Sequence, residues 1–86
     1  MTRVETEADM VADREIDITG DLCPMTFVRT RLALDRMSAG QVLKVRLRGE
    51  EPLRNVPRTA KEQGHAVISL TTGTDGIATL YLRRGD

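Results

Sequence analysis

The chain has 86 residues, the size of one small domain. Its 13 basic and 13 acidic side chains balance, and 40% of its residues are hydrophobic. This composition excludes a basic nucleic-acid-binding tail and an acidic disordered chain. The charges are nevertheless unevenly divided: residues 1–21 hold seven acids and two bases (net −5), whereas residues 22–86 hold six acids and eleven bases (net +5). We therefore expect a basic surface on the folded part.

The single cysteine, Cys23, cannot form an intrachain disulfide, which is typical of proteins from a reducing compartment. The sequence contains neither the run of about 18 apolar residues that a membrane span needs nor a signal-peptide pattern at its start. These features predict a cytoplasmic protein. Only Phe27 and Tyr81 are aromatic, so surfaces that stack on single-stranded nucleic acid are nearly absent.

The first strand of the fold is expected after a polar N-terminal segment. Residues 1–14 are polar without a clean period, and we interpret them as a flexible N-terminal tail before a single domain over residues 15–86. Residues 15–19 alternate, with Ile16 and Ile18 on one side, which predicts a half-buried strand.

A helix is predicted over residues 24–38, with Pro24 at its first position, where a missing N–H costs nothing. Its buried stripe comprises Phe27, Thr30, Ala33, Leu34 and Met37. A second, narrower apolar row comprises Met25, Val28 and Leu32. We expect this second row to pack against a neighbouring helix, with contact to a partner protein as the alternative.

Four further elements are predicted. They are a strand over residues 42–48, a helix over 53–63, and strands over 65–70 and 77–82 joined by a hairpin. The second helix should follow a turn over residues 49–52, be disturbed by Pro57, and be split or capped near Asn55. The order βαβαββ predicts an α+β two-layer sandwich, with a four-stranded mixed sheet and two helices packed on one face.

The alternation also assigns side chains to the open face of the sheet. Glu15 and Asp17 should lie there beside Lys44 and Arg46 of a neighbouring strand, where opposite charges can pair. The last strand should turn Thr79, Tyr81 and Arg83 to the same face. A solvated sheet face explains these charges without any function, and an RNA-binding surface is the alternative.

The candidate for chemistry is Cys23, because it lies between the end of a strand and the first residue of a helix. Helix N-terminal N–H groups and the helix dipole stabilise negative charge, so a cysteine there is a better thiolate than one in a strand. Pro24 would orient the sulfur by fixing the backbone. If the first two strands are parallel, Arg48 and Arg54 emerge at the same end of the sheet and add positive potential. Glu50 and Glu51 would oppose them.

The bland alternative is that Cys23 is a small buried hydrophobe. The sequence places no general base beside it, and His65, the only histidine, is expected in a surface or turn role. One cysteine and one histidine do not make a zinc site, and phosphate-loop and hydrolase motifs are absent from the sequence. We therefore expect no metal and no cofactor.

Several segments together resemble the TusA/SirA-like family of sulfur-carrier proteins. They are Asp-Leu-Cys-Pro-Met-Thr-Phe-Val-Arg-Thr-Arg-Leu-Ala-Leu, Met-Ser-Ala-Gly-Gln-Val-Leu-Lys-Val, Arg-Asn-Val-Pro and Gln-Gly-His-Ala-Val. The resemblance covers roughly residues 15–83 and implies a βαβαββ two-layer sandwich. The family motif at the first helix is Cys-Pro-x-Pro, and Cys23-Pro24 matches its beginning. Thr26 replaces the second proline, and its hydroxyl could compensate with a hydrogen bond toward the first turn or the sulfur.

The resemblance implies a sulfurtransferase in which Cys23 carries a persulfide. Sulfane sulfur would come from a cysteine desulfurase or a rhodanese-like donor and pass to an acceptor sulfur-relay protein, in tRNA thiolation, cofactor biosynthesis or sulfur oxidation. Pro24 and Thr26 would support the thiolate, and we expect Met25, Arg29 and Arg54 to contact partner proteins. Direct nucleic-acid binding is not expected. The alternatives are an RNA- or protein-binding regulatory module that uses the basic face, and a scaffold whose cysteine is blocked from solvent.

Overall fold

The structure is a computed structural model that describes residues 12–22 and 25–85. Its elements are β1 (Arg14–Asp17), α1 (Met25–Asp35), β2 (Val42–Arg48), α2 (Glu50–Glu62), β3 (Ala66–Thr72) and β4 (Ile77–Arg83). The predicted order βαβαββ is confirmed. Neither described helix is long and apolar enough to cross a membrane.

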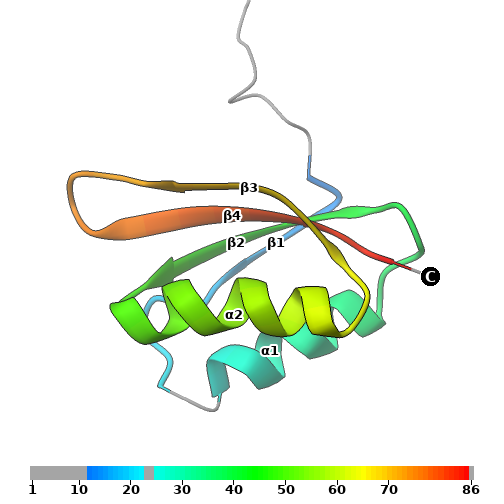
Figure 1. The fold of residues 1–86 in the computed structure, drawn as a ribbon, viewed down its shortest axis with the longest axis horizontal. Coiled ribbons are helices and arrows are strands. Elements are labelled where there is room, and N and C mark those ends of the chain that lie inside the picture. Colours follow the sequence, from blue (N-terminus) through cyan, green and yellow to red (C-terminus); the bar gives the residue numbers. More distant parts are fainter. Residues whose placement is uncertain (1–11, 23–24, 86) are drawn as a thin grey trace, which may run out of the picture.

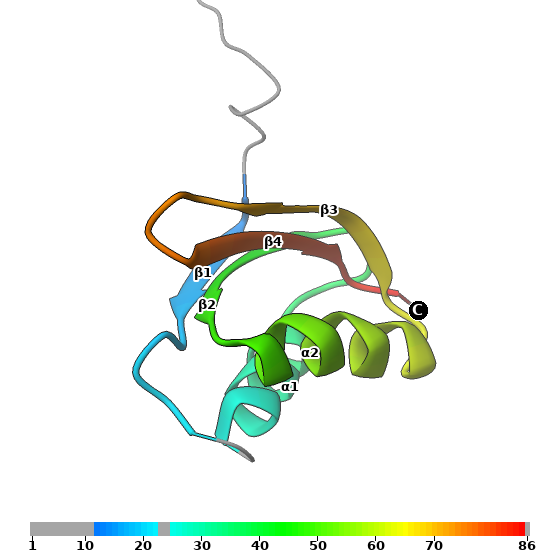
Figure 2. The ribbon, with the colours of Figure 1, turned by 60° about the vertical axis from the view of Figure 1, so that its left-hand side comes forward.

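The four strands form one mixed sheet in the order β1-β2-β4-β3. β1 runs parallel to β2, and β4 is antiparallel to both β2 and β3. Both helices lie on one side of this sheet (Figures 1 and 2), so the predicted two-layer sandwich is confirmed. Because β1 and β2 are parallel, the segments that lead into α1 and α2 leave the sheet at the same end.

The core between the layers is aliphatic. Alternate residues of the two central strands are fully buried, and β2 shows the pattern most clearly, since Leu43, Val45 and Leu47 are all 0% exposed. The remaining buried apolar residues are Ile18, Ala33, Leu34, Met37, Val56, Ala60, Ala78, Leu80 and Leu82. Each strand therefore gives one face to the helices and one to solvent, as the alternation predicts.

The buried face of α1 agrees with the predicted stripe. Thr30, Ala33, Leu34 and Met37 are buried, and Phe27 is partly buried against the core. The helix ends earlier than expected, because the N–H of Arg36 is shared between the carbonyls of Leu32 and Ala33, both at 3.3 Å. Such shared bonds tighten the last turn of a helix and end it.

The prediction for α2 was wrong at its start and at Pro57. Residues 50–52 form the first turn of one continuous helix, preceded by Gly49 at φ 101°, a conformation that glycine adopts without strain. Pro52 is tolerated because first-turn N–H groups lack helical partners in any case. Pro57 removes one internal hydrogen bond, but Val56 and Ala60 on either side are buried in the core, and this packing holds the helix together.

The open face of the sheet carries the predicted ion pairs. Lys44 Nζ lies 3.9 Å from Glu15 Oε2, and Arg46 Nη1 lies 3.9 Å from Asp17 Oδ2. All four side chains are partly exposed, so solvent screens both pairs and their contribution to stability is small. These pairs account for two of the three basic residues of β2, Lys44 and Arg46, and leave Arg48.

Candidate functional site

The candidate site lies where β1 passes into α1. Cys23 and Pro24 themselves lie outside the described residues, so the structure is informative about their two flanks. On the strand side, Ile18 is 1% exposed and its carbonyl accepts the N–H of Asp21 at 3.1 Å. On the helix side, the N–H of Met25 donates to Leu22 at 2.7 Å.

Both flanks of the cysteine are at the surface. Leu22 is 82% exposed and Met25 is 48% exposed. The first turn of α1 carries no acidic side chain, so no carboxylate on that turn opposes a negative charge at the start of the helix. The thiolate at Cys23 itself stays a prediction.

Thr26 belongs to the buried face of α1, which the predicted stripe did not include. It is 1% exposed, its carbonyl accepts a 2.8 Å hydrogen bond from the Thr30 hydroxyl, and its own Oγ1 has no partner among the described residues. The spacing of four between Thr26 and Thr30 was the signal in the sequence that could have placed it there. The expected bond to the first turn is not found among the described residues, and the bond to the sulfur stays a prediction.

Arg29 holds the β1–α1 loop from the helix side. Its guanidinium pairs with the Asp21 carboxylate and donates to the Asp17 carbonyl at 3.2 Å. The Arg29 side chain is still 42% exposed, so part of it remains accessible to a partner. Sequence reasoning did not identify Asp21 as its partner, because the two residues come together only when the loop folds back over the end of β1.

Basic and acidic groups meet at this end of the sheet, as expected. Arg48 ends β2, and α2 begins with exposed Glu50 and Glu51 before exposed Arg54. The two acids stabilise the N-terminus of α2 by lying at its positive end. They also offset the positive potential of Arg48 and Arg54 at this end of the sheet.

The second apolar row of α1 does not pack against another helix, and that prediction was wrong. Met25, Val28 and Leu32 are 48%, 40% and 49% exposed. The row lies at the margins of the contacts that α1 makes. Val28 borders the space toward α2 and Leu32 lies near Ile16 of β1, so these side chains stay largely exposed. Together with Leu22, these side chains are among the exposed large apolar residues of the described chain.

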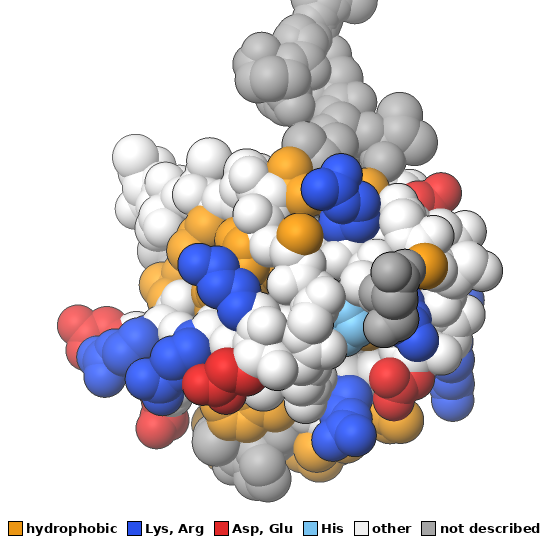
Figure 3. Space-filling model, turned by 45° about the vertical axis from the view of Figure 1, so that its right-hand side comes forward, with side chains coloured by type: hydrophobic (Ala, Val, Ile, Leu, Met, Phe, Trp, Pro, Cys, Tyr) orange, Lys and Arg blue, Asp and Glu red, His pale blue; other side chains and the backbone are white. Residues whose placement is uncertain are grey.

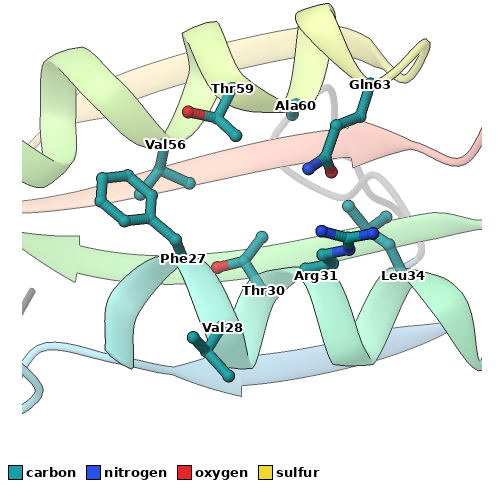
Figure 4. A pocket seen from close by; sticks show the side chains of 9 residues that line it. All are labelled: Phe27, Val28, Thr30, Arg31, Leu34, Val56, Thr59, Ala60 and Gln63. Carbon is teal, nitrogen blue, oxygen red and sulfur yellow. The ribbon is translucent and has the colours of Figure 1, made fainter. Parts of the chain in front are cut away.

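A pocket of about 150 Å³ lies between α1 and α2 (Figure 4). It is lined by Phe27, Val28, Thr30, Arg31, Leu34, Val56, Thr59, Ala60 and Gln63. Phe27 and Val56 face each other at one end, and Arg31 and Gln63 lie at the other. Val28 belongs both to the pocket and to the exposed apolar row, so the two features are continuous.

His65 has a structural role at the end of the molecule where β3 begins. Its Nδ1 accepts a 2.9 Å hydrogen bond from the N–H of Gly85, which secures the last described residue. Partial burial lowers the pKa of His65, and the Arg84 guanidinium lowers it further. A neutral histidine with an accepting Nδ1 is what this contact requires.

Charged side chains of both signs are mixed over the face that Figure 3 shows, rather than gathered into one basic patch. Over residues 12–22 and 25–85, no three His, Cys, Asp or Glu side chains lie together as a metal site. The face in Figure 3 therefore offers no continuous basic track of the kind that nucleic-acid backbones bind.

Comparison with known proteins decides the family. The family model described as Sulfurtransferase TusA matches residues 14–84, which include all six elements. The chain belongs to the TusA sulfurtransferase family. The resemblance read from the sequence is thereby confirmed.

Proteins similar to this TusA family protein are also described as sulfur carriers or as SirA-like. A candidate sulfur carrier protein of Archaeoglobus fulgidus is 37% identical over 70 residues, covering 81% of this chain and 80% of the relative. The candidate sulfur carrier YrkI of Bacillus subtilis is 29% identical over 76 residues, covering 88% of this chain and all of the relative. The crystal structure of a SirA-like protein from Desulfitobacterium hafniense has the same fold, with a TM-score of 0.73 at 23% identity, over 85% of this chain and 99% of that one.

Membership of the TusA family assigns a sulfur-carrier role in general terms.

Proposed function

We propose that this TusA family protein carries a persulfide on Cys23, accepts its sulfur from a donor protein and passes it to the cysteine of an acceptor. The main support is the position of the only cysteine in the sequence, between the exposed Leu22 and the start of α1. A sulfur carrier needs an exposed thiol, and both described neighbours of Cys23 are exposed.

The proposed transfer balances without an oxidant or a cofactor. The Cys23 thiolate attacks the outer sulfur of a donor persulfide, R–S–SH, and forms a new S–S bond while the donor S–S bond breaks. The products are Cys23–S–SH and the donor thiolate R–S⁻, so the negative charge moves to the donor and the proton stays on the transferred sulfur. Delivery repeats the step with the acceptor thiolate as the attacking group and the Cys23 thiolate as the leaving group.

The helix N-terminus assists both halves of this exchange. It stabilises the Cys23 thiolate before sulfur is accepted, and it stabilises the same thiolate as it leaves during delivery. Pro24 and Thr26 support this arrangement in the proposal, Pro24 through its fixed φ and Thr26 as a buried residue of the first turn. Pyridoxal phosphate or another cofactor would belong to the donor protein, a cysteine desulfurase or a rhodanese-like enzyme.

Partner proteins would dock on the surface around the cysteine. Met25 gives an exposed apolar contact, and Arg29 and Arg54 give accessible positive charge on either side. Transient interfaces combine apolar anchors with a charged rim in this way. The acceptor would be a sulfur-relay protein, and the destinations that fit are tRNA thiolation, cofactor biosynthesis and sulfur oxidation in the cytoplasm.

The decisive experiment is mass spectrometry of the full chain after incubation with a cysteine desulfurase and L-cysteine. We expect one added sulfur atom, removed by a reductant and absent from Cys23→Ser. Alkylation rates measured against pH should also show a thiol pKa below the reference value of about 8.5. If a panel of desulfurases, rhodanese-type donors and inorganic polysulfide adds no sulfur to Cys23, the proposal is wrong.

The docking surface is tested separately from the chemistry. Arg54→Glu should slow loading by a protein donor roughly 3- to 10-fold, because a charge on an interface rim mainly changes the association rate. Loading by inorganic polysulfide, which needs no docking surface, should stay unchanged. Arg83→Glu is the matched control, since Arg83 pairs with Val42 at the other end of the sheet. Equal loading rates for both variants would exclude Arg54 from the interface and leave the role of Cys23 intact.

A further inference from the structure

One edge of the sheet is open along a complete strand. The strand order leaves β1 and β3 at the two edges, and β3 pairs only with β4. Figures 1 and 2 show β3 at the margin of the sheet with no described element beyond it. Within residues 12–22 and 25–85, the backbone groups on its outer side therefore have no strand to pair with, and such an edge is a template for another strand.

β3 contains none of the residue types that hinder an edge strand from pairing with another strand. The strand reads Ala-Val-Ile-Ser-Leu-Thr-Thr, seven residues without a charge, a proline or a glycine. Valine, isoleucine and threonine also favour extended backbone. Soluble proteins commonly protect edge strands with lysine, proline, inward-pointing charges or short length, and β3 has none of these.

One feature of β3 hinders pairing, and it limits the part of the strand with which a partner strand could pair. The ladder between β3 and β4 is irregular between Val67 and Ser69, where a bulge bends the strand. From Ser69 to Thr72 the pairing with β4 is regular. A partner strand would accordingly pair with residues 69–72.

Leu70 is the second observation, and it points to the same segment. It lies opposite Leu80 of β4, so both side chains face the helix layer. Leu80 is fully buried, whereas Leu70 is 40% exposed. The edge thus combines unpaired backbone with an apolar side chain that lacks cover, and one added strand would satisfy both.

We propose that β3 pairs antiparallel with β3 of a second copy of this chain, about a twofold axis at Leu70, to give a weak dimer with one continuous sheet. Directly opposite residues of antiparallel strands share a face, so this register places Leu70 against Leu70 of the second copy on the helix side. Ser69 then lies opposite Thr71 on the open side. No charge faces a like charge anywhere along the paired strands, which makes the segment complementary to itself.

The size of this contact sets its strength. A stable protein interface buries about 1,200–2,000 Å² in total, and one short strand pair with a leucine contact buries less. Association should therefore be reversible, with a dissociation constant on the order of 0.1–1 mM, as for transient contacts at the small end of the range.

Sedimentation velocity of the full chain tests the proposal, in reductant so that Cys23 cannot link two chains. The weight-average mass should rise from one chain toward two as the concentration increases from about 10 µM to about 1 mM. Leu70→Lys places like charges opposite each other on the axis and should remain monomeric throughout. Thr74→Lys, in the β3–β4 loop, adds the same charge outside the strand and should dimerise like the parent chain.

The outcomes are distinct. A single-chain mass at every concentration overturns the proposal, as does a dimer that survives in Leu70→Lys, since association would then use another surface. If Leu70→Lys fails to fold, the double variant Ser69→Lys/Thr71→Lys replaces it. Both residues face the open side, and in the proposed register they lie opposite each other, so like charges again meet across the pairing. In the parent chain, backbone N–H groups of residues 69–72 should gain protection from hydrogen exchange as the concentration rises, and unchanged protection counts against the pairing.

Discussion

The two edges of the sheet differ in length, charge and support. β1 has four residues, three of them charged, and the Arg29 side chain bonds to the carbonyl of Asp17 at its end. β3 has seven residues, none of them charged. The short, charged edge resists pairing with other chains, and it leads directly into the loop that contains Cys23. Charged side chains and their hydrogen bonds are therefore concentrated at the β1 edge, beside the proposed sulfur site. The β3 edge lacks them, and it is the edge proposed to pair with a second chain.

The largest expected effect concerns what anchors β1. Ile18 is 1% exposed and its N–H donates to the Arg46 carbonyl at 2.9 Å. Ile18→Ala should lower the free energy of unfolding by about 2 to 5 kcal/mol, measured by urea denaturation, because it leaves a cavity in the core. Ile16→Ala, at a partly buried position within β1, is the control and should cost less. An equal cost would show that β1 is not anchored mainly at Ile18.

A smaller effect should follow from removing the interactions of Arg29. Arg29→Met leaves the Asp21 carboxylate and the Asp17 carbonyl without this donor and should cost about 1 kcal/mol of unfolding free energy, since both partners are partly exposed. Arg31→Met is the matched control on the same helix, because Arg31 only approaches Asp35 at 3.9 Å and is 66% exposed. If the two variants unfold at the same denaturant concentration, the Arg29 contacts do not stabilise the β1–α1 loop.

A smaller loss of stability should come from protonation of His65, the residue before β3, when the pH is lowered. Burial lowers the pKa of His65 from 6.5, so the unfolded chain takes up a proton before the folded chain does. The contribution of neutral His65 to stability is complete above about pH 6.5 and is lost as the pH falls from there to the folded-state pKa. His65→Gln keeps an acceptor for the Gly85 N–H and should remove this part of the pH dependence in denaturation curves. A parent chain equally stable at pH 7 and pH 5 would contradict the expectation.

The smallest effect belongs to Asp17, at the end of β1. Hydrogen bonds from the side chain and backbone of Thr19 lower the pKa of Asp17 below 3.8. Its contribution to stability is present above pH 3.8 and is lost as the pH falls through the folded-state pKa. An NMR titration of the Asp17 carboxyl should show this lowered pKa in the parent chain and a value nearer 3.8 in Thr19→Ala. The same midpoint in both proteins would show that Thr19 has no influence.

Strand alternation and the position of Cys23-Pro24 allowed much of this molecule to be predicted. The faces of β2 and β4, the buried stripe of α1 and the ion pairs of the open sheet face follow from periods of two and 3.6, which are local properties of the backbone. The position of Cys23 before a helix made it the candidate thiol, and its role and those of the side chains around it stay predictions. Local rules succeeded wherever a side chain's environment depends only on its own element.

The errors arose where distant segments meet. Pro57 suggested a broken helix, but the packing of Val56 and Ala60 on the sheet holds α2 together. The outer row of α1 was expected against a neighbouring helix, yet the crossing of the two helices leaves Val28 and Leu32 exposed. Neither result can be read from the segment in which the residues occur.

The sequence by itself determined the order of the elements, the inward and outward faces of the strands, and the placement of the single cysteine before a helix, because these depend on residues a few positions apart. Only the tertiary structure decided that Arg29 bonds to Asp21 and Asp17, that His65 secures Gly85, and that Leu70 lies uncovered on an open edge. The reason is physical: these contacts depend on the order of the strands and on how the helices lie across them, and both are set by the burial of one shared core.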